Sequence, residues 1–508
     1  MASQQVRVLE KYSLKSDNVP ADITISERMD EYVNTYDVEQ VKLYKATEVV
    51  LNYLKEKIIS SVNVKISEIL DPREIEGVRK KFIAKADELV SQDMGASMGA
   101  EERKIIVGKL VHELLGLGDV EVLLSDEHLE EIVINSAREP VWVYHKKWGW
   151  LKTNIEVKNE EQVQNYAAII ARKVGRQVTN LNPLLDAHLT TGDRVNAVLF
   201  PISTHGNCIT IRKFAESPWT IVKMMSPEIN TVNPDVAALL WLAVQYEMNM
   251  LISGGTGSGK TSFLNAILVF TPPNQRVVSI EDTRELYLPK YLNWTPMVTR
   301  QANPEGKGEV SMLDLMVNSL RMRPDRIVLG EMRRQREAEV LFEAMHTGHV
   351  VYATVHADDA NQTKKRLISP PIALPEAMLE ALHLIVVQYR QRRTGVRRVF
   401  EVAEVVPTME GAGINKIYKW IPREDEIKKI GDYVRLLDQF ELYTGMTPQE
   451  INSDLAEKKK MLTYLRDKKV FGVQDVGKVV AAYYRKKDEV MKAVEKKADP
   501  RKIFDLEA

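Results

Sequence analysis

The most regular hydrophobic pattern lies between residues 250 and 387. Short apolar runs alternate there with longer segments whose apolar residues recur at helical spacing. Short runs with almost no polar interruption are typical of parallel strands that are buried on both faces. The runs are Met250–Ile252, Val277–Ile280, Arg326–Leu329, Val350–Ala353 and Leu384–Val387. We therefore expect an α/β domain built on one parallel sheet with helices on both faces.

The pattern before this domain is mixed. Helices and strands alternate over residues 101–216, which predicts a smaller α+β domain. Residues 1–100 are expected to begin with a mobile start and to continue as a helical N-terminal region. This prediction rests on apolar residues that recur near helical spacing, namely Val41, Tyr44, Val49, Leu51, Leu54 and Ile58. The helices would either pack as an amphipathic bundle on their neighbour or serve as a docking arm for a partner.

Two further segments are defined by composition. Pro218, Pro227 and Pro234 punctuate a stretch without a sustained period, so we expect an interdomain linker at 217–232. The parallel-sheet domain then covers 233–405. The chain becomes lysine-rich beyond it, and a helical C-terminal extension is expected at 406–508.

The first of the short apolar runs leads into a glycine-rich loop. Gly254 to Thr261 fits the phosphate-binding pattern G-x-x-x-x-G-K-[ST], and apolar residues at helical spacing follow it. Glycines let backbone N–H groups turn towards phosphate oxygens, and the start of the helix adds its positive dipole end. Lys260 is expected to reach the terminal phosphates and Thr261 to hold Mg²⁺. The expected nucleotide-binding residues are Gly255, Thr256, Gly257, Ser258, Gly259, Lys260, Thr261 and Ser262.

Titratable residues follow three of the other predicted strands. An acidic cluster, Glu281–Glu285, follows one strand, Gly330 and Glu331 follow the next, and His356 follows a third. Parallel strands present their carboxyl ends at the same edge of a sheet, so these groups should converge on the glycine-rich loop. Glu331 gives a variant Walker B pattern whose carboxylate can hold Mg²⁺ through its waters. A carboxylate of the cluster would orient and deprotonate an attacking water.

Two histidines, His349 and His356, bracket one predicted strand. Either of them could sense the terminal phosphate of a bound nucleotide, and His356 is the preferred candidate.

Composition narrows the class of protein. The 508 residues are enough for two or three domains, and 70 basic against 71 acidic residues give a net charge of −1, which provides no global attraction for nucleic acid. Cys208 is the only cysteine, which excludes an internal disulfide and a tetracysteine zinc site and fits a reducing cytoplasm. We expect neither a signal peptide nor a transmembrane helix, because no apolar run is long enough.

Four motifs in this order make the chain resemble the secretion ATPase superfamily, which drives type II secretion, type IV pili and the archaellum. They are the phosphate loop at Gly254–Thr261, the Asp box at Ile280–Glu285, the variant Walker B at Arg323–Arg333 and the His box at Thr347–His356. The resemblance implies a RecA-like core, with Glu285 activating water and Glu331 holding the metal. It extends upstream over about residues 115–405, where Arg194 and Arg212 resemble arginines that approach the nucleotide from the N-terminal domain.

Within that superfamily the chain is similar to the archaeal members. The bacterial members usually carry a tetracysteine zinc subdomain, which one cysteine cannot form. Segments such as Gly116–Glu121, Pro140–His145 and Ser369–Ile372 also resemble the archaeal branch.

The resemblance implies a cytoplasmic, Mg²⁺-dependent ATPase that assembles as a homo-oligomer, a hexamer, at the inner face of the membrane. It would act on a polytopic membrane platform protein and power assembly of a pilus-like surface filament, with an archaellum motor as the alternative.

A DNA-translocating ring would share the nucleotide core and is an alternative of another class. It needs basic residues interleaved with aromatic ones in its pore. The sequence has Arg390–Arg393 and Arg397–Arg398 but no aromatic ladder around them. A nucleotide-binding scaffold without hydrolysis would lack the carboxylates, which are present here.

Overall fold

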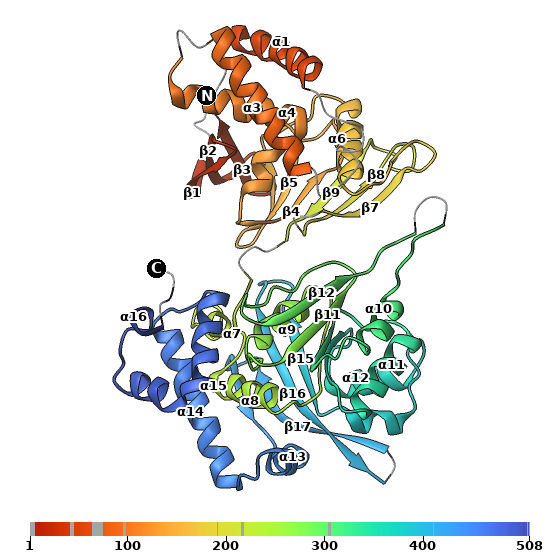
Figure 1. Ribbon diagram of the computed structural model, residues 1–508, viewed down its shortest axis with the longest axis vertical. Coiled ribbons are helices and arrows are strands. Elements are labelled where there is room, and N and C mark those ends of the chain that lie inside the picture. The colour runs from red at the N-terminus through yellow and green to blue at the C-terminus, as the bar shows by residue number, and fades with distance from the viewer. Residues whose placement is uncertain are drawn as a thin grey trace. The chain divides into compact units, whose positions relative to one another are not determined.

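The computed structural model describes residues 6–40, 45–62, 75–94, 98–189, 192–214, 218–302, 306–409, 411–504 and Leu506. Four stretches of the expected N-terminal region (1–5, 41–44, 63–74 and 95–97) and Ser217 of the expected linker lie outside the described residues. The chain divides into two compact units, Met1–Glu216 and Ser217–Ala508, each of which contains a nine-stranded sheet (Figure 1).

The smaller unit has a mixed sheet in the order β1-β2-β3-β6-β5-β4-β9-β8-β7, which is antiparallel except where β3 pairs with β6. Its strands are β1 (Val6–Ser16), β2 (Val19–Arg28), β3 (Thr35–Gln40), β4 (Leu129–Ile134), β5 (Trp142–His145), β6 (Gly149–Thr153), β7 (Leu184–His188), β8 (Arg194–Val198) and β9 (Cys208–Arg212). Its helices are α1 (Lys45–Ser61), α3 (Ile75–Met94), α4 (Ala100–Leu115), α5 (Val120–Ser125) and α6 (Glu160–Lys173).

The expected mobile start is wrong, because residues 6–40 form three strands of this sheet. Alternate residues of β2, including Ala21, Ile23 and Ile25, are buried in the core of the unit. Asp17 and Asn18 connect β1 to β2 and both have positive φ, as a two-residue hairpin turn requires. The expected helices begin only after these strands, and α1, α3 and α4 share a small apolar core of their own.

The larger unit has the sheet order β12-β11-β13-β14-β10-β15-β16-β17-β18. The first six strands of this order run parallel and the last three are antiparallel. The strands are β10 (Met250–Gly254), β11 (Arg276–Glu281), β12 (Asn293–Val298), β13 (Arg326–Leu329), β14 (Val350–Val355), β15 (Leu384–Arg390), β16 (Arg397–Thr408), β17 (Gly411–Ile421) and β18 (Glu426–Lys429). The parallel strands confirm the expected α/β core with a RecA-like fold.

Helices surround this sheet in Figure 1, with α10 to α12 on one side and the C-terminal helices on the other. Both faces of the sheet are covered by large apolar clusters, which explains the uninterrupted apolar runs of its strands. The helices are α7 (Ile221–Met224), α8 (Pro234–Gln245), α9 (Lys260–Leu268), α10 (Met312–Ser319), α11 (Gln335–His346), α12 (Ala360–Ile368), the 3₁₀ helix η1 (Glu376–Ala381), α13 (Arg435–Thr444), α14 (Pro448–Asp467), α15 (Val473–Glu495) and α16 (Pro500–Phe504).

The described part of the expected linker is not a flexible connection. Ile221, Val222 and Val232 are almost completely buried in the core of the larger unit, because α7 packs its apolar side chains against that core. Residues 218–232 therefore belong to the larger unit.

The expected helical extension at 406–508 is also not separate from the core. It starts with β17 and β18, which pair with β16 and extend the sheet. Helices α14 and α15 then contribute buried residues such as Leu465 and Val480 to the same cluster as α8. The lysines on the outer faces of these elements give this part of the sequence its lysine-rich composition. The apolar faces of the same elements complete the core.

Candidate active site

The glycine-rich loop lies between β10 and α9, as the motif requires. Gly257 and Gly259 have φ values of 70° and 91°, in the left-handed region where a side chain would be strained. A Cβ at Gly254 would come within 2.3 Å of the Gln388 carbonyl oxygen, so only glycine fits beside β15. The loop is therefore held in its turn by backbone conformation and by close contact with the neighbouring strand.

Lys260, the first residue of α9, is folded into this loop and is only 8% exposed. Its ammonium group donates to the carbonyl oxygens of Gly254, at 2.9 Å, and Gly255, at 3.1 Å. Its Nζ also lies 3.2 Å from Nδ1 of His356. Burial lowers the pKa of Lys260, and the nearby carboxylates of Glu331, Glu285 and Asp358 oppose that shift.

His356 connects Lys260 to Glu331. Its Nε2 lies 3.0 Å from one oxygen of Glu331, while its Nδ1 faces the lysine. Burial and the positive charge of Lys260 lower the pKa of His356, so the ring is neutral at neutral pH. A neutral ring with its proton on Nε2 satisfies both contacts, since it accepts from Lys260 and donates to Glu331.

Glu331 follows β13 and is also held from the opposite side by Arg333. Nη2 of Arg333 donates to the second oxygen of Glu331 at 2.6 Å, and its Nη1 donates to Asp282 at 3.0 Å. Burial by itself would raise the pKa of Glu331, but the hydrogen bond from Arg333 and the surrounding positive charges lower it below its ordinary value. The carboxylate is thus ionised and fixed in direction.

The acidic cluster after β11 separates into a buried and an exposed carboxylate. Glu281 is 1% exposed, and burial raises its pKa to about 7. Glu285 is exposed, yet it is close enough for its charge to act on Lys260. Of the two, Glu285 is therefore the carboxylate that a bound nucleotide and its water could reach.

Thr261 and Glu331 offer the donors that Mg²⁺ prefers. Both are oxygen ligands, and Thr261 lies in the first turn of α9 directly after Lys260. No group of three or more metal-ligating side chains occurs in the described part of the chain. This donor set fits Mg²⁺ that is shared with phosphate oxygens, because Mg²⁺ in such sites takes only one or two carboxylates from the protein.

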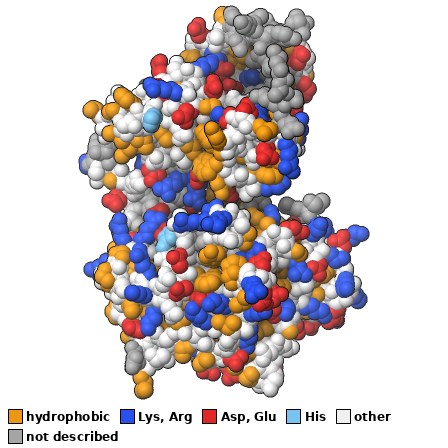
Figure 2. All heavy atoms as spheres, turned by 180° about the vertical axis from the view of Figure 1, so that it is seen from behind, with side chains coloured by type: hydrophobic (Ala, Val, Ile, Leu, Met, Phe, Trp, Pro, Cys, Tyr) orange, Lys and Arg blue, Asp and Glu red, His pale blue; other side chains and the backbone are white. Residues whose placement is uncertain are grey.

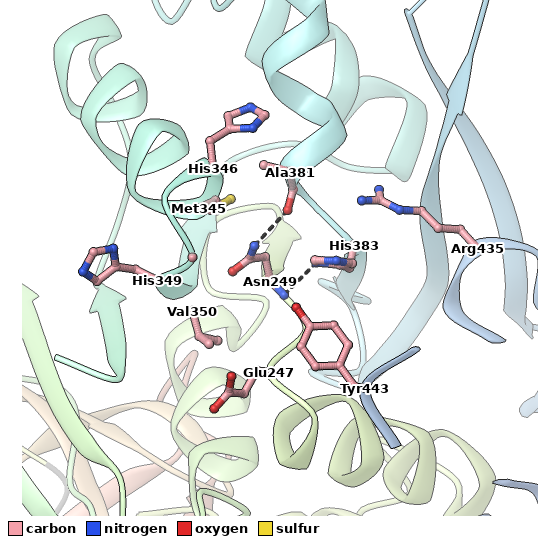
Figure 3. Close-up of a pocket in the computed structure, with 11 residues that line it drawn as sticks. Glu247, Asn249, Met345, His346, His349, Val350, Ala381, His383, Arg435 and Tyr443 are labelled. Atoms are coloured by element: carbon pink, nitrogen blue, oxygen red, sulfur yellow. Dashed lines mark hydrogen bonds between the residues drawn. The ribbon is translucent and has the colours of Figure 1, made fainter. Parts of the chain in front are cut away.

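His349 is excluded as a phosphate sensor, since it precedes β14 whereas His356 follows it. The six residues of this strand separate their backbones by roughly 20 Å, at about 3.3 Å per residue. His349 instead lines a cavity of about 220 Å³ at the amino ends of β10, β14 and β15, where Figure 3 places it on the far side from Arg435. The buried His383 of this cavity accepts a hydrogen bond from the Asn249 N–H at 3.0 Å.

Arg194 and Arg212 lie directly opposite each other on the adjacent antiparallel strands β8 and β9 of the smaller unit. Arg194 forms a two-bond ion pair with Asp186, at 3.0 and 3.2 Å, and Arg212 also lies opposite Glu131 of β4. Like charges in opposite positions repel each other, and these carboxylates reduce that repulsion. The structure therefore brings the two arginines side by side on this sheet.

The sequence pattern missed two further arginines at the phosphate loop. Arg390 ends β15 and Arg397 begins β16, and the two are cross-strand partners. Nε of Arg397 donates to the Gly257 carbonyl at 3.2 Å, and a Cβ at Gly257 would lie 2.8 Å from Nη1 of Arg390. The sequence could have predicted Arg390 at the phosphate loop, because it stands at the carboxyl end of a parallel strand, like the other site residues.

On the face drawn in Figure 2, basic and acidic side chains are intermingled over the larger unit, in agreement with the net charge of −1. Among the described helices, none combines the length and the apolar composition needed to span a membrane.

Fold and site together define a RecA-like P-loop protein. Residues 115–397, more than half of the chain, match the family described as Type II/IV secretion system protein. The uncharacterized protein MJ0900 of Methanocaldococcus jannaschii is 34% identical over 396 residues, which are 76% of this chain and 71% of that protein. The chain belongs to the Type II/IV secretion system protein family.

Two other similarities are more distant. The type IV secretion system protein PtlH of Bordetella pertussis is 29% identical over 313 residues, 58% of this chain and 89% of that protein. The X-ray structure of the Legionella pneumophila ATPase DotB matches with a TM-score of 0.41 and 20% identity, and it covers 71% of this chain and 93% of that one.

Proposed function

We propose that this protein is a Mg²⁺-dependent ATPase that works as a ring-shaped motor, a hexamer, at the cytoplasmic face of a membrane. The observation that carries the proposal is the connected group of Lys260, His356 and Glu331 at the phosphate loop. Family membership supports a role in secretion or in filament assembly. Its partner would be a polytopic membrane platform protein, and its product a type IV pilus-like filament, with archaellum rotation as the alternative.

In the proposed reaction, a water molecule attacks the γ-phosphorus of ATP and the bond to the β-phosphate oxygen breaks, which releases ADP. Glu285 accepts the proton of the water, because its carboxylate is exposed and close to Lys260. Lys260 leaves the loop carbonyls and binds the terminal phosphates. Thr261 and Glu331 would hold Mg²⁺, which supplies positive charge to the phosphate oxygens.

The contacts of His356 would differ between the nucleotide-free and the nucleotide-bound site. When Lys260 turns towards the phosphates, the contact with Nδ1 of His356 is lost, and His356 keeps only its Nε2 contact with Glu331. Arg194 and Arg212 would contribute positive charge to the bound phosphates, as the family motifs imply. Loss of the terminal phosphate after hydrolysis would release these arginines and allow the smaller unit to move.

Steady-state ATP turnover tests this function in the wild type and in Lys260→Ala, Glu285→Gln and Glu331→Gln. Each substitution is expected to lower turnover by roughly a hundredfold, the effect of removing a charged catalytic group. Wild-type turnover in Lys260→Ala would contradict the proposal. Turnover of the wild type should also require Mg²⁺ and stop when EDTA is added.

A DNA-translocating ring is the second candidate. Arg390–Arg393 and Arg397–Arg398 favour it, and so does the ring of Tyr389, which contacts the rings of Phe400 and Trp420. Two of these arginines already have other contacts, since Arg397 binds the phosphate loop and Arg398 binds Asp425. Stimulation of turnover by single-stranded DNA would support this candidate.

A further inference from the structure

Glu281, at the end of β11, makes contacts that explain how the exposed Glu285 is held. One oxygen of Glu281 accepts the backbone N–H groups of Glu285, at 2.9 Å, and Leu286, at 3.1 Å. These two bonds close the turn that follows β11 and fix the position of the Glu285 backbone. The turn is thus organised by a carboxylate that is itself immobilised by burial.

Glu281 also packs against the backbone next to Glu331. A Cβ at Gly330 would lie 3.3 Å from Cγ and 3.4 Å from Cα of Glu281, and the Gly330 N–H donates to the Ile280 carbonyl at 2.8 Å. Any side chain larger than hydrogen at Gly330 would press on Glu281. A single residue therefore touches the turn that carries Glu285 and the strand end that carries Glu331.

The second oxygen of Glu281 is buried and has no hydrogen-bond partner among the described residues. Burying a carboxyl oxygen without a hydrogen-bond partner is unfavourable. Packing alone therefore does not explain why a glutamate occupies position 281. The charged groups that act on it are Arg284 and Glu285 of its own turn. Because it is enclosed, Glu281 is poorly placed to accept a proton from a water at the nucleotide.

We propose that Glu281 is a positioning residue for ATP hydrolysis, which fixes the Glu285 turn against the Gly330–Glu331 strand end. This inference rests on the proposed ATPase function. A general base must be held within hydrogen-bond reach of its water, and a displacement of about 1 Å can cost roughly a hundredfold in rate. Glu281 acts through the backbone and need not touch the nucleotide.

Three substitutions at position 281 separate positioning from proton transfer. Glu281→Gln keeps an oxygen that can accept both N–H groups, Glu281→Asp withdraws that oxygen by one methylene, and Glu281→Leu removes it at similar size. We expect kcat of Glu281→Gln to stay within about threefold of the wild type, and kcat of Glu281→Asp and Glu281→Leu to fall at least roughly tenfold. Since the expected nucleotide-binding residues lie in the phosphate loop and not in this turn, the affinity for a fluorescent ADP analogue should stay within about twofold in all three.

Two outcomes would overturn this role. If Glu281→Gln is as inactive as Glu285→Gln while it binds ADP normally, then Glu281 is itself the base. If Glu281→Asp and Glu281→Leu both keep kcat within about twofold of the wild type, Glu281 is not needed to position the Glu285 turn. Failure of the ATPase function is distinguishable, because Lys260→Ala and Glu285→Gln would then also turn over normally.

Discussion

Lys260 and His356 are in direct contact across the carboxyl edge of the central sheet, with Nζ 3.2 Å from Nδ1. The two residues come from α9 and from the end of β14, which are 96 positions apart in the chain. The parallel pairing of β10 with β14 brings them together. The same ring binds Glu331, so one histidine joins the phosphate loop to the carboxylate expected at the metal.

His356→Ala is expected to lower ATP turnover by roughly 10- to 100-fold, because the contact of Nε2 with Glu331 is lost and a hydrogen bond to a charged group contributes about 1.5–3 kcal/mol. Initial rates at saturating ATP measure this effect. His349→Ala is the matched control from the same motif, and it should keep turnover within about twofold because it lies at the opposite end of β14. Equal losses in both variants would contradict the role assigned to His356.

Arg397→Ala is expected to weaken ADP and ATP binding by roughly 3- to 10-fold. The substitution frees the Gly257 carbonyl and removes a positive charge beside the phosphate loop. Equilibrium titration with fluorescent nucleotides measures this change in affinity. Arg393→Ala, at the exposed tip of the same hairpin, removes the same charge away from the loop and should bind nucleotide normally. If both variants bind equally weakly, the effect comes from overall charge and not from the contact with the loop.

Arg194→Ala and Arg212→Ala test the proposed role of the arginine pair on β8 and β9 of the smaller unit. If both arginines approach the phosphates, each variant should lose roughly tenfold in turnover, as expected when one charge-assisted contact to a phosphate is removed. Arg172→Ala, an exposed arginine near the end of α6 in the same unit, serves as the control. Wild-type turnover and nucleotide affinity in both variants would remove these arginines from the mechanism.

The central fold and the loop could be predicted because their causes are local in the sequence. Apolar runs such as Val277–Ile280 indicate buried parallel strands, and the positions where they end predicted the convergence of Glu331 and His356. The N-terminal strands were missed although Asp17 and Asn18 are typical hairpin-turn residues, because only one face of β2 is buried and its other face is polar. The position of Arg397 depends on the pairing of β15 with β16, which the apolar pattern does not define.

The C-terminal helices are expected to be required for stability of the larger unit. Trp241 of α8 is fully buried, stacks on Phe270 at 5.0 Å and donates to the hydroxyl of Tyr484 in α15 at 2.9 Å. Trp241→Ala should therefore destabilise this unit by about 3–5 kcal/mol, as measured by urea unfolding. Trp150→Ala removes a half-exposed tryptophan of the smaller unit and should leave the same transition unchanged. A Trp241→Ala transition at the wild-type urea concentration would show that α8 and α15 contribute little.

Asp425 makes the stability of the larger unit sensitive to acid. Its carboxylate accepts two hydrogen bonds of 2.7 Å from Arg398, which lower its pKa to about 2, and a further one from Trp420 at 2.9 Å. A pKa that is lower in the folded state gives stability that is fully present above the unfolded value, about 3.9, and is lost as the pH falls towards the folded value. Asp425→Asn removes this contribution and tolerates the positive φ of 51° at this position.

We therefore expect the wild type to melt at a higher temperature than Asp425→Asn at about pH 6, and this difference to shrink steadily between about pH 4 and pH 2. Thermal unfolding at a series of pH values measures it. Glu426→Gln, a change at an adjacent side chain that is 65% exposed, should show no such convergence. A difference between wild type and Asp425→Asn that stays constant down to about pH 2 would mean that the pair with Arg398 does not stabilise the fold.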